Sequence, residues 1–314
     1  MKKEELKKIL EAIQQVKIAV VGDFCLDSYW FIDEAMSEIS IETNLPTRPV
    51  RQQRYSLGGA GNVTNNLAAM GVGDIRAFGV IGTDPFGTEM VRIMNRTGIK
   101  TNNLLVQEEE WCTHTYSKPY LDDAELSRID FGNYNLLSEN TADRLIANLV
   151  REIPEVDVIL INQQVLSGIH TRYFREELLG VIQRFPEKMF IVDSRHYNDF
   201  FAGAIRKMND TEAARLCGLD KAPGDVVLYS EVVACAEELY RRFQKPLFIT
   251  RGKKGSLAIS EKGISDIPGL MIISRVDTVG AGDSYLAGAA TALAAGYDMG
   301  TAARIGTFVA GVTI

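Results

Sequence analysis

The chain has 314 residues, of which 46% are hydrophobic and 24% charged, with a formal net charge of -7. This composition is typical of a globular protein, and the scattered Lys and Arg residues argue against a nucleic-acid partner. No apolar run approaches the roughly 20 residues of a membrane-spanning helix, so we expect no membrane partner. Four well-separated cysteines without a C-x-x-C pair indicate the reducing cytoplasm and predict neither disulfides nor a zinc site.

Strand and helix patterns alternate along the chain. The first 15 residues place Leu and Ile at helical spacing among charges and predict a surface helix. Apolar, β-branched runs then predict buried strands at 17–23, 75–81, 156–161, 189–193 and 246–250. Helical patterns lie between them at 62–70, 87–97, 141–152, 171–184 and 230–243. This alternation predicts an α/β fold with a mostly parallel sheet that helices cover on both faces.

Two stretches interrupt the alternation. Residues 28–55 are rich in Thr, Val, Ile and aromatic residues, and residues 113–131 hold two alternating segments around the turn Asp122-Asp123. Both predict antiparallel strands outside the main sheet, which would form a small flap over its edge. Two hairpins without a function are the alternative. Because no repeat or linker divides the chain, residues 1–314 are predicted to form one domain.

A glycine-rich run near the C-terminal end, DTVGAGD at 277–283, precedes small residues of helical composition. Gly280 and Gly282 allow a sharp turn with accessible N–H groups, and the following helix directs the positive end of its dipole to the same place. A carboxylate at Asp283 beside such an anion hole could accept a hydroxyl proton during phosphoryl transfer to an alcohol. The alternative is that Asp283 only caps the helix and the glycines only form a turn.

Three further patterns each allow a functional and a structural interpretation. Residues 57–62 (LGGAGN) run into a helix, so they form either a ligand-binding glycine turn or a plain helix start. Residues 250–255 (TRGKKG) follow a strand and could wrap phosphates or form a β-turn between strands. Asn209 and Glu212 lie one helical turn apart, which favours either a site for phosphate and Mg²⁺-bound water or a capping box.

Five motifs together resemble those of the ribokinase-like, or PfkB, carbohydrate kinases in order and spacing, over nearly the whole chain. They are residues 58–62, 79–87 (GVIGTDPFG), 209–212 (N-x-x-E), 250–255 and 277–283. The resemblance implies a ribokinase-like three-layer α/β/α sandwich with a β-lid, and an ATP- and Mg²⁺-dependent sugar kinase. A non-catalytic homologue that binds a sugar or nucleotide is the alternative. A Rossmann dehydrogenase is not indicated, because G-x-G-x-x-G does not follow the first strand.

The resemblance also implies roles for individual residues of this sequence. Asp283 takes the position of the catalytic base, and the anion hole is supplied by Gly280, Ala281 and Gly282. The acceptor sugar would be bound by Asp27, Gly58, Gly59, Asn62 and Arg128. The nucleotide would be bound by Asn209, Thr250, Gly252 and Gly255. Glu212 would order Mg²⁺ through water, and a monovalent cation such as K⁺ is bound in some members at the positions of Asp277 and Val279.

Within the family, the chain is most similar to bacterial heptose 7-phosphate kinases, which phosphorylate the anomeric O1. The similarity lies in residues 20–30 (VVGDFCLDSYW), in residues 38–50 (EISIETNLPTRPV) and in Arg128 with Asp130. Two segments depart from that group, because residues 162–166 (NQQVL) replace Asp-Tyr-Gly-Lys-Gly and residues 193–195 (DSR) replace Asp-Pro-Lys.

Two further expectations follow from the resemblance. Family members usually continue past the helix after Asp283 with a loop and a final helix that help to hold adenine and the cation, so those contacts are not carried over. Lids clasp each other in several relatives, and open strand edges favour pairing, which together predict a homodimer through the β-lid.

Overall fold

The structure is a computed structural model that describes residues 3–222, 224–271 and 279–313. In these ranges a main sheet has nine strands in the order β14-β13-β12-β11-β10-β9-β1-β4-β5, parallel from β12 to β5 and antiparallel at β13 and β14. The strands are β1 (Lys17–Gly22), β4 (Asp74–Ile81), β5 (Lys100–Val106), β9 (Val158–Gln163), β10 (Met189–Ser194), β11 (Ile205–Asn209), β12 (Leu247–Thr250), β13 (Ser256–Ser260) and β14 (Gly263–Ile267).

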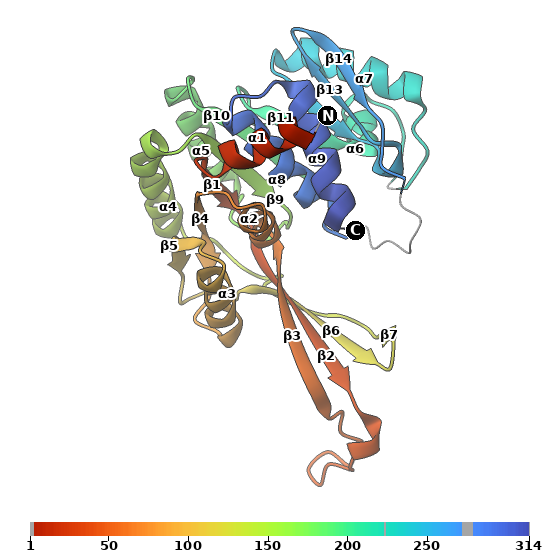
Figure 1. The fold of residues 1–314 in the computed structure, drawn as a ribbon. Helices are drawn as coiled ribbons and strands as arrows, with labels where there is room; N and C mark the ends of the chain where they lie inside the picture. The colour runs from red at the N-terminus through yellow and green to blue at the C-terminus, as the bar shows by residue number, and fades with distance from the viewer. Residues whose placement is uncertain (1–2, 223, 272–278, 314) are drawn as a thin grey trace.

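Helices cover both faces of this sheet (Figure 1). One face packs against α1 (Lys3–Ile13), α2 (Ala60–Ala69), α3 (Pro85–Arg96), α8 (Ala281–Ala294) and α9 (Met299–Thr313). The other face packs against α4 (Glu139–Glu152), α5 (Arg172–Arg184), α6 (Asp210–Leu216) and α7 (Tyr229–Phe243). The three-layer α/β/α arrangement confirms the predicted fold class.

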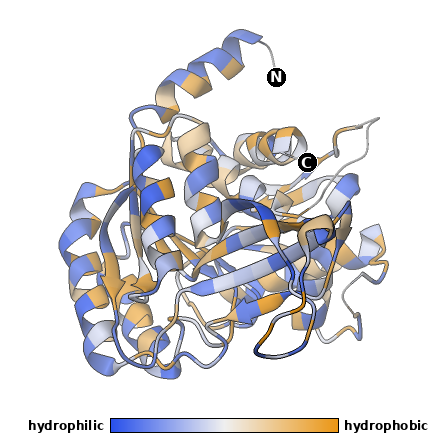
Figure 2. Ribbon diagram, turned by 90° about the horizontal axis from the view of Figure 1, so that it is seen from below, coloured by the Kyte–Doolittle hydropathy of each residue, from blue (hydrophilic) through white to orange (hydrophobic). Residues whose placement is uncertain are grey.

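The composition of the strands explains the layers. All six residues of β9 are buried, and alternate residues contribute to the cores on opposite faces, with Val158 and Leu160 on one side and Ile159 and Ile161 on the other. Figure 2 shows hydrophobic residues along such strands, between helices with hydrophilic outer surfaces. A strand that is apolar on both faces is stable only where helices cover both faces.

A second sheet lies outside the main one, in the order β3-β2-β6-β7, with β8 also paired to β6. Its strands are β2 (Phe24–Ile32), β3 (Val50–Gly59), β6 (His114–Leu121), β7 (Ala124–Glu125) and β8 (Ile129–Phe131). Figure 1 shows β2, β3 and β6 projecting away from the layered body. The predicted strands in 28–55 and 113–131 therefore do lie outside the main sheet.

The pairing inside the second sheet corrects one expectation. Strand β2 is antiparallel to β3, as predicted, but parallel to β6. The reason is that β2 follows β1 and β6 follows β5, and both of these belong to the parallel part of the main sheet. Two segments that leave the carboxyl ends of parallel strands run in the same direction.

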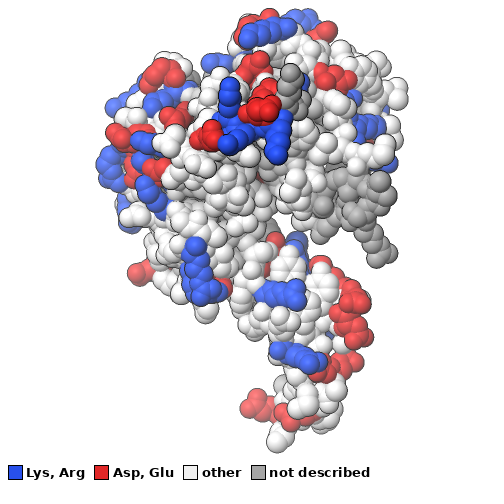
Figure 3. All heavy atoms as spheres, viewed as in Figure 1, with Lys and Arg blue, Asp and Glu red and all other residues white. Residues whose placement is uncertain are grey.

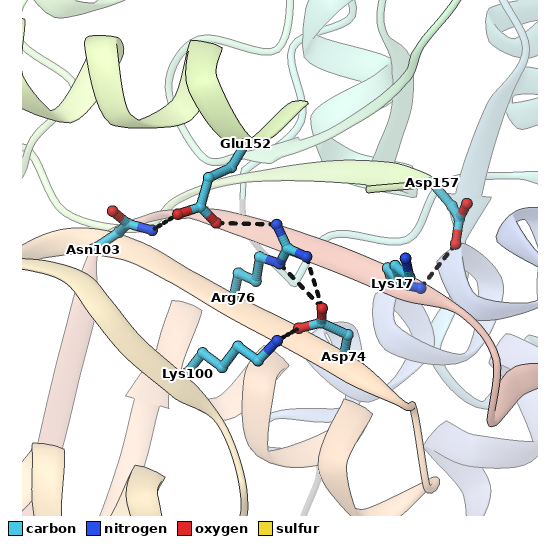
Figure 4. A network of polar contacts seen from close by, with 7 residues as sticks. All are labelled: Lys17, Asp74, Arg76, Lys100, Asn103, Glu152 and Asp157. Atoms are coloured by element: carbon cyan, nitrogen blue, oxygen red, sulfur yellow. Dashed lines mark hydrogen bonds and ion pairs between the residues drawn. The ribbon is translucent and has the colours of Figure 1, made fainter. Parts of the chain in front are cut away.

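A polar network joins β4, β5 and α4 near the amino-terminal ends of the strands (Figure 4). Arg76 donates to Asp74 at 2.8 Å and to Glu152 at 3.2 Å, and Lys100 pairs with Asp74 at 3.0 Å. Asn103 donates to the second oxygen of Glu152 at 2.9 Å. Since ligands of open α/β sheets bind at the opposite, carboxyl ends of the strands, we assign this network a structural role.

On the face shown in Figure 3, Lys and Arg lie among Asp and Glu on the layered body, and Asp and Glu gather along one edge of the projecting second sheet. Across the described ranges, every helix is too short or too polar to cross a membrane.

Candidate active site

Asp283 lies in the first turn of α8. Gly280 is the N-cap of this helix, with a left-handed φ of +80°, and Asp283 follows three residues later. Its Oδ2 accepts a hydrogen bond from Asn62 Nδ2 of α2 at 2.9 Å. The interpretation of Asp283 as the helix cap is therefore wrong, because Gly280 occupies that position and the carboxylate faces Asn62.

Gly280 is needed for a second reason besides its positive φ. A Cβ added there would come within 2.7 Å of Asn62 Nδ2, so a side chain would displace the partner of Asp283. The N–H groups of a first helical turn have no partners within the helix. Gly280, Ala281 and Gly282 thus lie at a helix start, where such N–H groups could bind an anion.

Burial raises the pKa of Asp283 to about 6, even though the hydrogen bond from Asn62 acts in the opposite direction. The nearby Asp193 carboxylate raises this pKa further, whereas Lys207 and Arg195 lower it. A carboxylate with a pKa near 6 is mostly ionised at neutral pH yet is a stronger proton acceptor than an ordinary aspartate. These are the properties of a general base.

A buried ion pair lies beside the start of α8. Lys207 Nζ of β11 is 2.7 Å from Asp193 Oδ2 of β10, and only 8% and 9% of their side-chain surfaces are exposed. Burial lowers the pKa of Lys207, but the charges of Asp193, Glu212 and Asp283 outweigh it and raise this pKa. A Cβ added at Gly282 would come within 2.9 Å of Lys207 Nζ, so the ammonium group lies against the first turn of α8.

Asn209 and Glu212 form a capping box at the start of α6. Asn209 Oδ1 accepts from Glu212 N at 2.8 Å, and Glu212 Oε2 accepts from Asn209 N at 2.8 Å. The structural interpretation of N-x-x-E is thus confirmed. Burial raises the pKa of Glu212, and the neighbouring Asp193 carboxylate raises it further. Since the two carboxylates repel each other, a divalent cation bound beside them would stabilise both.

The loop of residues 250–255 joins the antiparallel strands β12 and β13, so the turn interpretation is confirmed. Thr250 ends β12 directly beside Asn209, which ends β11. Gly255 has a φ of +93°, and a Cβ there would lie 2.0 Å from Ile267 O, which excludes any side chain. Gly252 also has a positive φ, of +54°, but faces open space. The fold therefore explains Gly255 without invoking a ligand.

Asp27 of β2 lies among residues of the second sheet. Lys118 Nζ of β6 is 2.8 Å from Asp27 Oδ1, and Tyr116 is the cross-strand neighbour of Asp27. A Cβ added at Gly58 would lie 3.4 Å from Asp27 Oδ2. At Gly59, where φ is +54°, an added Cβ would lie 2.4 Å from the main-chain oxygen of Asp23. The two glycines thus bring the backbone of β3 close to β2.

Arg128 directly precedes β8 of the same sheet. It forms a two-point ion pair with Asp130, at 2.6 and 2.7 Å, and its guanidinium lies 4.3 Å from the centre of the Tyr116 ring. Arg195, which directly follows β10, acts on the pKa values of both Tyr116 and Asp283. The Arg195 charge therefore lies near enough to act on both groups.

Main-chain hydrogen bonds fix residues 162–166, the first of the two segments that depart from the heptose kinases. The buried Asp23 carboxylate accepts hydrogen bonds from the main-chain N–H groups of Gln164, Val165 and Ile169, at 2.8, 3.1 and 3.0 Å. The side chain of Asn162 lies on the same face of the sheet as that of Asp193, its neighbour on β10. Its side chain is fully buried, and neither polar atom has a hydrogen-bond partner in the described part of the chain.

One of the two residues predicted to bind a monovalent cation lies outside the described part of the chain. Asp277 lies outside the described residues, and Val279 is 76% exposed. In the part of the chain that the structure describes, no three His, Cys, Asp or Glu side chains converge as a metal site. A Mg²⁺ ion bound beside Glu212 would keep phosphate and water ligands, which is its usual preference.

The structure brings most of the predicted residues together in two groups. Asp283, Gly280, Ala281 and Gly282 lie with Asn62, while Asp27, Gly58 and Gly59 lie on the second sheet and Arg128 lies beside it. Cys25 connects the two groups, because the charges of both Asp27 and Asp283 act on its thiol. Sequence reasoning assigned no role to Lys207, Lys118 or Tyr116, although Lys207 stands only two residues before Asn209.

Comparisons with known proteins agree with this arrangement. Residues 17–314 match the model of the pfkB family of carbohydrate kinases. The chain is 28% identical over 308 residues to the bifunctional protein HldE of Hydrogenovibrio crunogenus, an alignment that covers 96% of this chain and 59% of that protein. It is 26% identical to D-beta-D-heptose 7-phosphate kinase of Bordetella bronchiseptica, covering 97% and 92%. The chain thus spans about three fifths of the bifunctional relatives.

Solved structures show the same fold. Ribokinase from Thermotoga maritima superposes with a TM-score of 0.69 at 20% identity, covering 94% of this chain and 91% of the other. Arabidopsis thaliana ribokinase complexed with ribose and ATP gives a TM-score of 0.70 at 18% identity, covering 95% and 91%. From the family match and this fold, the chain belongs to the pfkB family of carbohydrate kinases.

Proposed function

We propose that this protein transfers the γ-phosphoryl group of ATP to a hydroxyl group of a sugar or sugar phosphate, with Asp283 as the general base. The observation that carries the proposal is the position of Asp283 in the first turn of α8, hydrogen-bonded to Asn62 and with a pKa near 6. A proton acceptor at a helix amino terminus serves both parts of the reaction, since the same place stabilises anionic oxygens.

In the proposed reaction, Asp283 accepts the proton of the acceptor hydroxyl. At the same time, the oxygen of that sugar hydroxyl forms a bond to the γ-phosphorus. The bond from that phosphorus to the bridging oxygen breaks, and ADP leaves. The first-turn N–H groups at Gly280, Ala281 and Gly282 would stabilise negative charge on the transferred oxygens. Lys207, which lies against that turn, would contribute a positive charge.

The nucleotide would lie along the ends of β11 and β12, where Asn209 and Thr250 are neighbours, with Gly252 and Gly255 in the adjoining loop. Glu212, through water, and Asp193 would hold Mg²⁺ together with the phosphates of ATP. Bound there, Mg²⁺ would neutralise phosphate charge and orient the γ-phosphoryl group. Asp277 and Val279 remain the proposed positions for a monovalent cation such as K⁺.

A phosphorylated sugar is the acceptor that we propose, with heptose 7-phosphate, phosphorylated at O1, as the first candidate. The relatives named above include a heptose 7-phosphate kinase. Independently, Lys118, Arg128 and Arg195 place three cations around Asp27 and Tyr116. Asp27 would accept from sugar hydroxyls, with Gly58, Gly59 and Asn62 beside it, and the cations would favour an anionic substituent.

The test is an ATP-consumption assay with a panel of sugars and sugar phosphates that includes heptose 7-phosphate and its dephosphorylated form. We expect turnover with a phosphorylated sugar and a loss of about 10²- to 10⁴-fold in kcat for Asp283→Asn. Equal turnover by the wild type and Asp283→Asn would remove Asp283 from the mechanism. Calorimetric binding of a sugar or nucleotide without any phosphoryl transfer would instead favour a non-catalytic homologue.

A homodimer in the cytoplasm completes the proposal. The connection between β2 and β3 exposes Met36, Ile39, Ile41 and Leu45, an apolar group at the end of the second sheet. Pairing of this segment with a second copy would cover these side chains. Light scattering at micromolar concentration should give twice the chain mass for the wild type and a smaller mass for Ile41→Asp. The cytoplasmic location rests on the four free cysteines.

A further inference from the structure

The motif of residues 79–87 has a structural position that the proposed chemistry does not use. Its loop joins β4 to α3 and lies against the chain that enters β6 of the second sheet. Asp84 is the N-cap of α3, and its Oδ1 accepts from Gly87 N at 3.0 Å. Its other oxygen, Oδ2, accepts from Thr113 N at 2.7 Å. One carboxylate therefore joins a helix of the main body to the residue that precedes β6.

Thr113 completes the connection in the opposite direction. Its side chain is fully buried, and its Oγ1 accepts from Gly82 N at 3.0 Å. The two segments thus exchange hydrogen bonds, with main chain and side chain contributed by both. We call Gly82, Asp84, Gly87 and Thr113 the β6 clamp.

The glycines of the β6 clamp allow this close approach. A Cβ at Gly82 would lie 2.9 Å from Trp111 O and 2.4 Å from Asp84 Oδ2. A Cβ at Gly87 would lie 2.8 Å from both Gly82 O and Thr113 Oγ1. Neither glycine has a positive φ, so steric contact rather than backbone conformation requires them. The spacing G-x-D-x-x-G therefore encodes the contact with Thr113.

The position of β6 determines where two side chains near Asp27 lie. From Thr113, the strand runs parallel to β2 and places Tyr116 opposite Asp27 and Lys118 within 2.8 Å of its carboxylate. A change at the start of β6 would shift both side chains relative to Asp27. Since β2 leaves the main sheet directly after β1, the β6 clamp is a separate attachment that fixes β6 from the other side.

We infer that Asp84 and Thr113 are positioning residues for the acceptor sugar, a role that rests on the proposed sugar-kinase function. They touch neither sugar nor nucleotide. They hold the start of β6 against the main body, so that Tyr116 and Lys118 remain beside Asp27. Loss of either bond leaves β6 free to move while Asp283 and the ends of β11 and β12 stay in place.

Two variants separate this role from a general structural one. Asp84→Ser keeps an N-cap acceptor for Gly87 N but loses the bond to Thr113 N, and Thr113→Val loses the acceptor for Gly82 N with little change in shape. Thr113→Ser keeps it. A matched control is Thr171→Val, since Thr171 caps α5 by accepting from Phe174 N at 3.2 Å and makes no bond to the second sheet.

Steady-state kinetics give the first measurement. We expect Asp84→Ser and Thr113→Val to raise KM for the acceptor sugar about tenfold, with KM for ATP within about twofold of the wild type. Thr113→Ser and Thr171→Val should leave the acceptor KM unchanged. Equal effects on both substrates, or equal effects of Thr113→Val and Thr171→Val, would overturn the inference.

Amide hydrogen exchange gives a second measurement that needs no activity. In Thr113→Val and Asp84→Ser, residues 114–121 should exchange at least about tenfold faster than in the wild type, whereas residues of β9 should be unchanged. Unchanged exchange in β6 would refute the β6 clamp itself. Faster exchange in a protein that phosphorylates no sugar would refute the proposed function and leave the β6 clamp standing.

Discussion

The acidic limb of the pH–rate profile tests the role of Asp283 most directly. With a pKa near 6, Asp283 is about 90% ionised at pH 7 and about 10% ionised at pH 5, so kcat/KM should fall about tenfold between them. At the ordinary value of 3.8, Asp283 would still be about 94% ionised at pH 5, and the rate would hardly change. The measurement is kcat/KM for the sugar at saturating ATP from pH 5 to 8.

Titration of substrate phosphates could produce a similar limb, and a variant distinguishes the two causes. The hydrogen bond from Asn62 lowers the pKa of Asp283, so Asn62→Leu should move the limb to higher pH, whereas a substrate titration would stay fixed. Asn65→Leu changes another half-buried asparagine of α2 and is the matched control. A wild-type limb below pH 5, or a limb that Asn62→Leu does not move, refutes Asp283 as the titrating base.

Three more changes have definite expected outcomes. Asp283→Asn should stabilise the protein above pH 6 by up to about 3 kcal/mol, because the pKa of Asp283 is about 6 in the folded protein and 3.8 ordinarily, so burial of the charge costs that difference. The gain in stability should shrink as the pH falls through 6. Thermal melts at pH 7.5 and pH 5 check both expectations. Lys207→Met should lower the free energy of unfolding by about 3–5 kcal/mol, because it leaves the buried Asp193 carboxylate unpaired. The double variant with Asp193→Asn should regain stability but not activity, and denaturant melts and steady-state kinetics measure the two. Gly282→Ala should fold but lower kcat by displacing Lys207 Nζ; an unchanged kcat would argue against a role for this ammonium.

How far the sequence predicts the fold depends on whether a segment contains its own signal. The apolar sequence of β9 predicts a buried strand, and both of its faces are buried. The pattern does not predict β11, because Arg206 and Lys207 are charged and hydropathy does not show the partners that allow their burial. Arg206 is 1% exposed and donates to the main-chain oxygens of Asn198, Phe201 and Ala204, at 2.7, 2.9 and 2.9 Å. Hydropathy periodicity does not show such hydrogen bonds, even though these partners lie within eight residues of Arg206.

The second sheet shows the same limit for pairing. The sequence predicts strands in 28–55 and 113–131, because β-propensity and turns are local properties. Whether β2 and β6 run parallel depends on where each chain leaves the main sheet, and this requires the order of β1, β4 and β5. The long loop between β2 and β3 and the segment before β6 carry no pattern that fixes that order.

The candidate site shows why a motif names a residue but not its chemistry. The run at 277–283 identifies Asp283, yet its pKa depends on burial and on Asn62, which lies 221 positions away in the chain. An exposed Asp283 would be a weaker base, with a pKa near its ordinary value. The packing that makes Asp283 a base also destabilises its ionised form. The helix start, the Asn62 hydrogen bond and the Lys207 charge therefore act together, because each offsets part of the cost of burying the carboxylate.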